Sequence, residues 1–357
     1  MWLNHYESGD LTLDIELTTN CNAKCPQCSR TDQDNNLQKY SWLKLNQVSI
    51  EDWASWFTEE DLTKIKRFHF SGTYGDPGMC KDLAKIVDHI INNSSAMVSI
   101  NTNGSMRDAD FWFDIGAVGQ KRLKFIFDVD GIDQEMHSFY RRGTNLNKVL
   151  ENLEAAAMTP AEVEVLTVLF KHNENYLEQI QDMCRELGAT GFDSVEGNNF
   201  KKGDVYEFLN ENGDTEVLEQ VVNISSLQDP KRLSRRVRDH RHDAIAEDIK
   251  CVAANGKNLK ISSASQVFPC CYVSIALGWK TGVRSGKPTS SYITYTGNDG
   301  DSPSHLMQDY IDRKEDFMLS HRSLKEILTD HWYSENLKAS FTCNPTFACS
   351  KVCGGAK

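Results

Sequence analysis

Residues 16–28 read Glu-Leu-Thr-Thr-Asn-Cys-Asn-Ala-Lys-Cys-Pro-Gln-Cys, which places cysteines at positions 21, 25 and 28. The spacing C-x3-C-x2-C is typical of a loop that wraps three corners of a 4Fe-4S cube. Three thiolates, from Cys21, Cys25 and Cys28, leave the fourth iron open to another ligand. A zinc loop is the competing interpretation, because C-x2-C pairs are common in zinc sites.

Short β-rich runs alternate with amphipathic helical stretches from about Leu11 to Gly197. This alternation predicts βα units on a parallel sheet, and six such units form a partial (β/α)6 barrel rather than a closed one. The expected strands are 11–17, 67–71, 98–102, 124–129, 163–170 and 192–196. The expected helices are 51–57, 81–91, 145–157 and 176–187. In such barrels, the loops at the carboxyl ends of the strands carry the chemistry.

Length and composition narrow the class of protein. A chain of 357 residues is long enough for one large domain and a smaller one, and no window reaches the apolar length of a membrane span. Its formal charge of -12 argues against general nucleic-acid binding. Eleven cysteines without a signal peptide indicate a reducing, cytoplasmic setting, in which grouped thiols are interpreted first as metal ligands.

Three further motifs follow predicted strands. They are Ser71-Gly72-Thr73-Tyr74-Gly75-Asp76-Pro77, Ser99-Ile100-Asn101-Thr102-Asn103-Gly104 and Phe127-Asp128-Val129-Asp130-Gly131. In the third motif, Asp128 and Asp130 lie one residue apart on a strand, so both carboxylates point the same way and repel. We therefore expect one of them to have a raised pKa or a cationic partner, with Arg141 and Arg142 as the candidates.

Together these motifs resemble the radical S-adenosylmethionine (radical SAM) superfamily. The resemblance implies that the open iron binds S-adenosylmethionine and that the reduced cluster cleaves it to a 5′-deoxyadenosyl radical. The glycine-rich turn matches a loop that usually reads Gly-Gly-Glu-Pro; Asp76 has a shorter reach than Glu, which favours binding through the backbone of Gly72 and Gly75. The implied cofactor-binding residues are Gly72, Gly75, Asp76, Thr102, Asn103, Asp128 and Asp130.

The C-terminal cysteines resemble the auxiliary-cluster domain called SPASM, or twitch in its reduced form. Cys251, Ser265 and Cys270 follow C-x9–15-G-x4-C with serine in place of glycine, and Cys343, Cys349 and Cys353 reproduce C-x5-C-x3-C. Ser340 replaces a further cysteine, and the chain stops four residues after Cys353. We therefore expect one auxiliary 4Fe-4S cluster held by four of these five cysteines. Structural zinc is the alternative.

The motifs divide the chain into a barrel over residues 1–200, a bridging segment over 201–250 that contains helix, and a cluster domain over 251–357. Within the bridge, the basic run from Lys231 to His242 is interpreted as a solvated helix face, or alternatively as a grip on an anionic substrate or acidic peptide. The polar stretch from Lys280 to Ser304 is interpreted as a surface loop.

Three cysteines remain outside these motifs. Cys184 is expected in the core, because it lies in a helical pattern. Cys80 follows the glycine-rich turn, and a packed thiol is favoured over a role in the site. Cys271 is next to the expected ligand Cys270. It is interpreted as a spare ligand or a hydrogen-atom donor, and a thiol without either role is the favoured alternative.

The resemblance implies an enzyme that takes hydrogen from a peptide or protein substrate and leads to a crosslink, an oxidation or an epimerisation. It also implies an external electron donor of flavodoxin or ferredoxin type. Because the first strand is expected at Leu11, no N-terminal leader-binding module is expected. The alternatives are a twitch-type enzyme for a sugar, aminocyclitol or nucleotide, and a non-catalytic iron-sulfur protein.

Overall fold

A computed structural model describes residues 1–197, 200, 204–222, 249–274, 305–343, 346, 349 and 353. The basic run from 231 to 242 and the polar stretch from 280 to 304 lie outside the described residues, as does the side chain of Cys343. The interpretations given to those segments therefore stay predictions.

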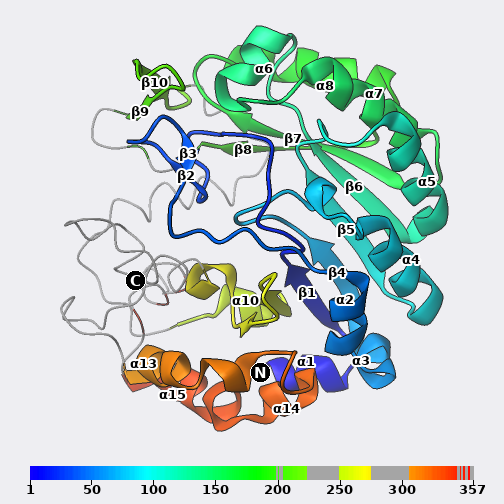
Figure 1. The fold of residues 1–357 in the computed structure, drawn as a ribbon, viewed down its shortest axis with the longest axis vertical. Coiled ribbons are helices and arrows are strands. Elements are labelled where there is room, and N and C mark those ends of the chain that lie inside the picture. The colour runs from blue at the N-terminus through cyan, green and yellow to red at the C-terminus, as the bar shows by residue number, and fades with distance from the viewer. Residues whose placement is uncertain are drawn as a thin grey trace.

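The main element is an eight-stranded sheet that curves into an open barrel, with helices on its convex side (Figure 1). Its strand order is β12-β11-β1-β4-β5-β6-β7-β8, and all neighbours are parallel except β11 and β12. The strands are β1 Leu11–Ile15, β4 Ile65–Phe70, β5 Met97–Thr102, β6 Leu123–Asp128, β7 Glu162–Leu169, β8 Gly191–Glu196, β11 Asn258–Ile261 and β12 Val267–Phe268. The six predicted strands and the predicted α/β fold class are confirmed.

Helices connect the parallel strands, as βα units require. Those of the barrel are α2 Ile50–Trp56, α3 Glu59–Lys64, α4 Leu83–Asn93, α5 Ala109–Gly119, α6 Gln134–Tyr140, α7 Leu146–Ala157 and α8 Leu177–Glu186. The four predicted helices correspond to α2, α4, α7 and α8. Ser49 and Thr58 begin α2 and α3 with capping boxes, in which the cap hydroxyl and the third helical residue satisfy each other's backbone N–H groups.

The two faces of the sheet differ in chemistry. On β1, Leu11, Leu13 and Ile15 are fully buried against the helices. The alternate residues Thr12 and Asp14 face the concave side, because successive side chains on a strand point to opposite faces. Barrel interiors of this kind are usually filled with branched apolar side chains. Polar residues on the concave face therefore mark a place for ligands rather than a packed core.

The segment after the barrel contributes two features that the sequence did not predict. Strand β11 pairs in parallel with β1 and so extends the barrel sheet. In the described part of the bridge, β9 Val205–Leu209 and β10 Thr215–Glu219 form an antiparallel hairpin. The helix expected in the bridge does not occur within residues 204–222. Two very short strands, β2 Thr31–Asp32 and β3 Gln38–Lys39, form a second small hairpin after the cysteine loop.

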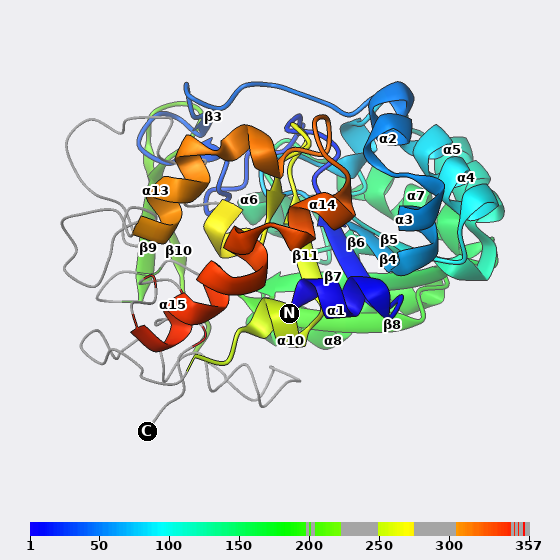
Figure 2. The ribbon, with the colours of Figure 1, turned by 90° about the horizontal axis from the view of Figure 1, so that it is seen from below.

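The remaining helices gather at one side, next to the N-terminal helix (Figure 2). They are α1 Trp2–Glu7, α10 Val252–Asn255, α13 His305–Asp312, α14 Leu324–Thr329 and α15 Leu337–Cys343, with a π-helical turn over Trp332–Asn336. Aromatic rings join them: Tyr310 stacks on Phe317 at 4.6 Å, and Trp2 meets Tyr333 edge-on at 6.1 Å. No helix in the described ranges is both long and apolar enough to cross a bilayer.

Candidate functional site

The cysteine loop leaves the carboxyl end of β1 and carries Cys21, Cys25 and Cys28. The Cys28 N–H donates to the Cys25 carbonyl at 3.1 Å, and the Ala23 N–H donates to the Cys21 sulfur at 3.3 Å. Burial raises the pKa of Cys25 to about 12, although the guanidinium of Arg141 opposes the shift. Without metal, these thiols are protonated at neutral pH, so metal binding must release their protons.

The three thiols of the cysteine loop fit an iron-sulfur cluster. Within the described residues, no group of three or more His, Cys, Asp or Glu side chains could hold one ion. A cube binds each thiolate to a different iron, so it does not require three sulfurs to converge on one point. The Tyr74 hydroxyl and the Asn101 Oδ1 are among the buried polar atoms that have no hydrogen-bond partner in the described part of the chain. Buried polar groups are normally paired, so these atoms fit a bound polar cofactor.

The glycine-rich turn after β4 is built on close backbone contacts. A Cβ on Gly72 would lie 1.4 Å from the Gly75 carbonyl oxygen, and one on Gly75 would lie 1.9 Å from the Thr18 carbonyl oxygen. The Asp76 N–H donates to the Asn20 carbonyl at 2.8 Å. The turn is therefore pressed against the start of the cysteine loop, and only glycine fits at either position.

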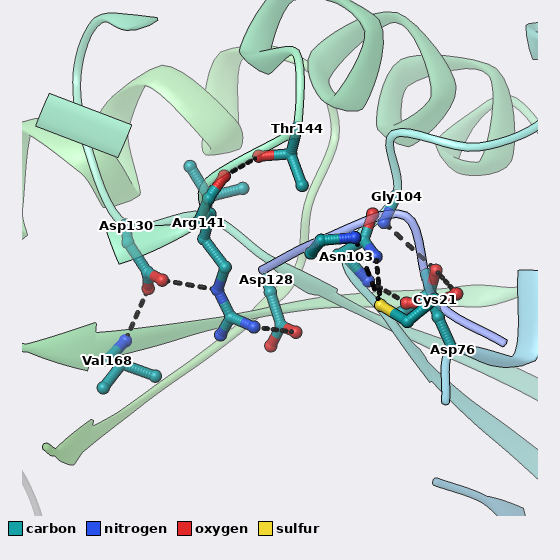
Figure 3. Close-up of polar contacts among 12 residues, drawn as sticks. Cys21, Asp76, Asn103, Gly104, Asp128, Asp130, Arg141, Thr144 and Val168 are labelled. Carbon is teal, nitrogen blue, oxygen red and sulfur yellow. Dashed lines mark hydrogen bonds and ion pairs between the residues drawn. The ribbon is translucent and has the colours of Figure 1, made fainter. Parts of the chain in front are cut away.

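The Asp76 carboxylate binds groups of the protein itself. It accepts hydrogen bonds from the Gly78 N–H at 2.8 Å, the Thr102 hydroxyl at 2.8 Å and the Asn103 N–H at 2.7 Å (Figure 3). These bonds fasten the turn to the end of β5. A positioning role for Asp76 follows from this geometry, whereas its predicted contact with a cofactor stays a prediction.

Asn103 joins the end of β5 to the cysteine loop. Its amide nitrogen lies 3.0 Å from Asn22 Oδ1 and 3.8 Å from the Cys21 sulfur, and its Oδ1 accepts from the Ser105 N–H at 3.0 Å. An N–H group directed at a thiolate stabilises the charged form. Asn103 therefore supports Cys21 directly, and it also ties the loop to the barrel.

The paired carboxylates at the end of β6 share one cation, as predicted (Figure 3). Arg141 Nη1 lies 2.9 Å from Asp128, and Arg141 Nε lies 2.6 Å from the fully buried Asp130. Asp130 also accepts from the Val168 N–H at 2.6 Å. Burial raises the pKa of Asp128 to about 7, opposed by Arg141 and reinforced by Asp130. Arg142, the other candidate, pairs instead with Glu211 and Glu216 near the β9–β10 hairpin.

Four of the five C-terminal cysteines lie near enough to influence one another's pKa, although among the described residues they form no group that could hold a single ion. The Val252 N–H donates to the Cys353 sulfur at 3.5 Å, and the Cys353 thiol is the main cause that raises the pKa of its neighbour Cys251. Burial raises the pKa of Cys270, and Cys349 is among the thiols that add to the shift. Burial also raises the pKa of Cys349 to about 11, with Cys353 beside it. Nothing in the described residues places the Cys343 side chain.

The other cysteines separate into two kinds. Cys80 and Cys184 are fully buried in the hydrophobic core, as expected of packed thiols. Cys271 is different: burial raises its pKa, and its charged neighbours are Asp14 and Lys260 on the concave face. Cys271 therefore lies near the Asp14–Lys260 pair, and among the described residues it is not part of the main hydrophobic core.

Ser265 stands where the predicted cysteine pattern has glycine, and its backbone conformation is one that favours glycine. Its φ is 64°, in the left-handed region that favours glycine. Its hydroxyl lies 2.9 Å from that of Ser320, which helps to hold the turn.

Sequence reasoning missed the polar groups beneath the cysteine loop. Arg30 is buried, and its guanidinium donates to the Tyr74 carbonyl at 2.7 Å and the Thr19 carbonyl at 3.3 Å. Glu16 is buried and accepts from the Tyr74 N–H. The alternation of apolar and polar residues from Leu11 to Glu16 could have identified Glu16 from the sequence. Arg30 lies in an irregular segment and carries no such signal.

Comparison with known proteins agrees with this geometry. Residues 15–184 match the model of the Radical SAM superfamily. A probable GTP 3′,8-cyclase of Methanocaldococcus jannaschii is 25% identical over 181 residues, which cover 50% of this chain and 56% of that protein. Its counterpart in Methanothermobacter marburgensis is 27% identical over 182 residues, with 50% and 55% covered. The chain thus spans about half the length of the curated relatives it matches.

Solved structures share the fold over more of the chain. Streptococcus suis SuiB bound to the precursor peptide SuiA has a TM-score of 0.53 at 13% identity, covering 95% of this chain and 70% of that one. Native anSMEcpe with bound AdoMet has a TM-score of 0.51 at 14% identity, covering 93% and 84%. Residues 15–184, slightly less than half of the chain, thus match the Radical SAM superfamily model, and the cysteine loop lies within that match.

Proposed function

We propose that this chain is a radical SAM enzyme that takes hydrogen from a peptide or protein substrate. When bound, a 4Fe-4S cluster and S-adenosylmethionine supply a 5′-deoxyadenosyl radical that removes hydrogen from unreactive carbon. Cys21, Cys25 and Cys28 would hold the cluster, supplied with electrons by a flavodoxin- or ferredoxin-like donor. The observation that carries the proposal is that all three thiols lie on one loop, braced by Asn103 and by the turn at Asp76.

The residues around the loop would hold the cofactor and exclude water. Gly72 and Gly75 would present backbone groups, because a side chain fits at neither position. Thr102, Asn103 and Asp76 would fix the end of β5. Asp128 and Asp130, held by Arg141, would form the wall of the cofactor site opposite the end of β5. Rigid placement of this kind is the protein's main contribution to a radical reaction.

A peptide or protein substrate is favoured by the extent of the fold match. SuiB, which was solved with its precursor peptide, aligns with nearly all of this chain, including residues beyond the barrel. A nucleotide or another small molecule is the second candidate, because the probable GTP 3′,8-cyclases are the relatives with higher identity. That similarity covers only about half of the chain.

The test is anaerobic reconstitution with iron and sulfide, reduction, and measurement of 5′-deoxyadenosine formed from S-adenosylmethionine. We expect product from the wild type and from Cys184→Ala, whose thiol is in the core, and none from Cys25→Ala. Deuterium transfer into deoxyadenosine from a labelled peptide or from labelled GTP identifies the substrate class. A wild-type protein with full iron content and no deoxyadenosine with any substrate would contradict the proposal.

We further propose that residues 1–200 form the radical SAM barrel and that 201–250 lead to a twitch-like domain over 251–357. Its auxiliary 4Fe-4S cluster would be held by Cys251, Cys270, Cys349 and Cys353. Cys251→Ala should then lower the iron content by about four per chain, whereas Cys271→Ala and Cys343→Ala should keep it. If Cys343→Ala lost as much iron as Cys251→Ala, Cys343 would be a ligand and this set of four would be wrong.

A further inference from the structure

One row of side chains crosses the concave face of the sheet and is polar throughout. Strand register places Asp14 beside Lys260 on one side and His69 on the other, and the row continues through Ser99 and Lys124. Neighbouring residues in register on a parallel sheet point to the same face. The row therefore lies inside the barrel, where a packed barrel would have branched apolar residues.

A cavity of about 370 Å³ opens on this row. Besides members of the row, its lining includes Thr12, Arg67 and Asn258, which lie toward the starts of β1, β4 and β11. Lys124 lies four residues before Asp128 on β6, which corresponds to roughly 13 Å along a strand. Among the described residues, none of the cysteine loop lines this cavity, although Asp14 connects it to the glycine-rich turn by accepting a hydrogen bond from the Ser71 hydroxyl.

Most charges at this cavity are already balanced. Lys260 is buried and lies 3.1 Å from Asp14. Lys124 pairs with Glu162 at 3.1 Å and with Glu164. Arg67 is the exception: across the described part of the chain, its half-buried guanidinium has neither an ion pair nor a hydrogen bond. A charged group that is partly removed from water is costly unless it is paired.

Other polar groups without a partner among the described residues lie around Arg67. His69 Nδ1 lies 2.7 Å from the Ser99 hydroxyl, which leaves Nε2 without a partner among the described residues. The Thr12 hydroxyl and the Asn258 amide, which also line the cavity, make no hydrogen bond within the described ranges. A guanidinium presents planar paired N–H groups that match the oxygens of a carboxylate or phosphate. Neutral donors around it complete the shell of such an oxyanion.

We infer that this cavity is a binding site for the oxyanion group of a small molecule, a phosphate or a carboxylate, with Arg67 as its principal ligand. The inference does not depend on the proposed function. The anion enters from the end of the barrel at which the strands begin, where Thr12, Arg67 and Asn258 lie.

The test uses the full chain with its clusters and titrates inorganic phosphate and, separately, acetate by calorimetry, with sodium chloride at matched ionic strength as the blank. We expect saturable binding to the wild type, at least tenfold weaker binding to Arg67→Gln and an intermediate loss in Arg67→Lys, which keeps the charge but not the paired donors. Lys66→Gln is the matched control, because Lys66 is the adjacent, exposed cation and pairs with Asp10.

The tighter of the two anions identifies the group that the site prefers. Equal affinity in the wild type and in a folded Arg67→Gln would overturn the inference, and so would no binding of either anion to the wild type. If Lys66→Gln weakened anion binding as much as Arg67→Gln does, the binding would come from general surface charge. That result would also overturn the inference. Circular dichroism and the cluster absorbance establish that each variant is folded.

Discussion

At the scale of single residues, the site depends on buried charges that are held by few partners. Arg141 is nearly enclosed and is the cation shared by Asp128 and Asp130. Removing one partner of a buried ion pair leaves the other charge uncompensated, which commonly costs about 3–5 kcal/mol. This makes Arg141 the residue whose loss should affect the free energy of unfolding most among the charged groups near the loop.

Arg141→Gln should therefore lower the free energy of unfolding by about 3 kcal/mol or more, measured by urea denaturation. Arg142→Gln is the matched control at the next position. Its partners Glu211 and Glu216 are 35% and 28% exposed, so solvent screens both pairs, and we expect a loss of about 1 kcal/mol or less. A loss below about 1 kcal/mol in Arg141→Gln would show that the aspartates do not depend on this cation.

His137 should make stability depend on pH. The Asp130 N–H donates to His137 Nδ1 at 3.2 Å, so the ring is neutral, with its proton on Nε2 toward the Thr144 hydroxyl at 3.0 Å. Burial lowers the pKa of His137 to about 4 from its ordinary 6.5. As pH falls from 6.5 toward 4, the unfolded chain binds a proton that the folded chain does not, so stability decreases, by about 3 kcal/mol at most.

His137→Gln cannot titrate and should lose this contribution to the pH slope. The measurement is the difference in unfolding midpoint between wild type and variant at several pH values from 4.5 to 8. The difference should shrink as pH falls, because only the wild type loses the contribution of the neutral ring. A difference that stays constant over this range would rule out the assignment.

At the scale of elements, contacts between the cysteine loop and its neighbours hold the three cysteines in place more than hydrogen bonds within the loop do. The turn containing Gly72 and Gly75 meets the backbone of Thr18 and Asn20, just before the first cysteine. A methyl group on Gly75 cannot fit 1.9 Å from a carbonyl oxygen, so the turn must move away from the cysteine loop.

Gly75→Ala should consequently bind much less iron at the loop than the wild type. Gly213→Ala is a suitable control: it has a φ of 89° in the β9–β10 turn, with its nearest contact at 3.6 Å, and tests backbone strain alone. Iron content and visible absorbance after reconstitution provide the measurement. Full iron content in Gly75→Ala would show that the turn can move without disturbing the cluster ligands.

At the scale of the whole molecule, the barrel and the C-terminal segment share one sheet. Strand β11 lies against β1, its residues Leu259 and Ile261 are buried, and the Trp2 indole donates to the Asn258 carbonyl at 2.8 Å. A chain that ends at residue 222 would leave the apolar edge of β1 exposed. We expect this fragment to lack a cooperative thermal transition. A sharp transition in the fragment would show that the barrel folds independently of β11.

The sequence predicted the parts of this structure that depend on local pattern. Short β-rich runs between amphipathic helical stretches identified the six barrel strands, and the spacing of Cys21, Cys25 and Cys28 identified the loop. Strand β11 has four residues and is specified by its contact with β1, so no local pattern marks it. The two aspartates pair with Arg141 and not with Arg142. Which arginine pairs with them depends on where each side chain points at the end of α6. Packing decides this direction, so the adjacent positions of the two residues in the sequence do not predict it.

The function proposed for this chain requires that Cys21, Cys25 and Cys28 hold a 4Fe-4S cluster with one open iron. Electron paramagnetic resonance of the reduced protein can detect this cluster alone, in a variant in which Cys251, Cys270, Cys343, Cys349 and Cys353 are all alanine. We expect a cluster signal that changes when S-adenosylmethionine is added and that is absent when Cys25 is also alanine. A cluster signal that S-adenosylmethionine leaves unchanged, or tightly bound zinc in place of iron, would refute the open iron site.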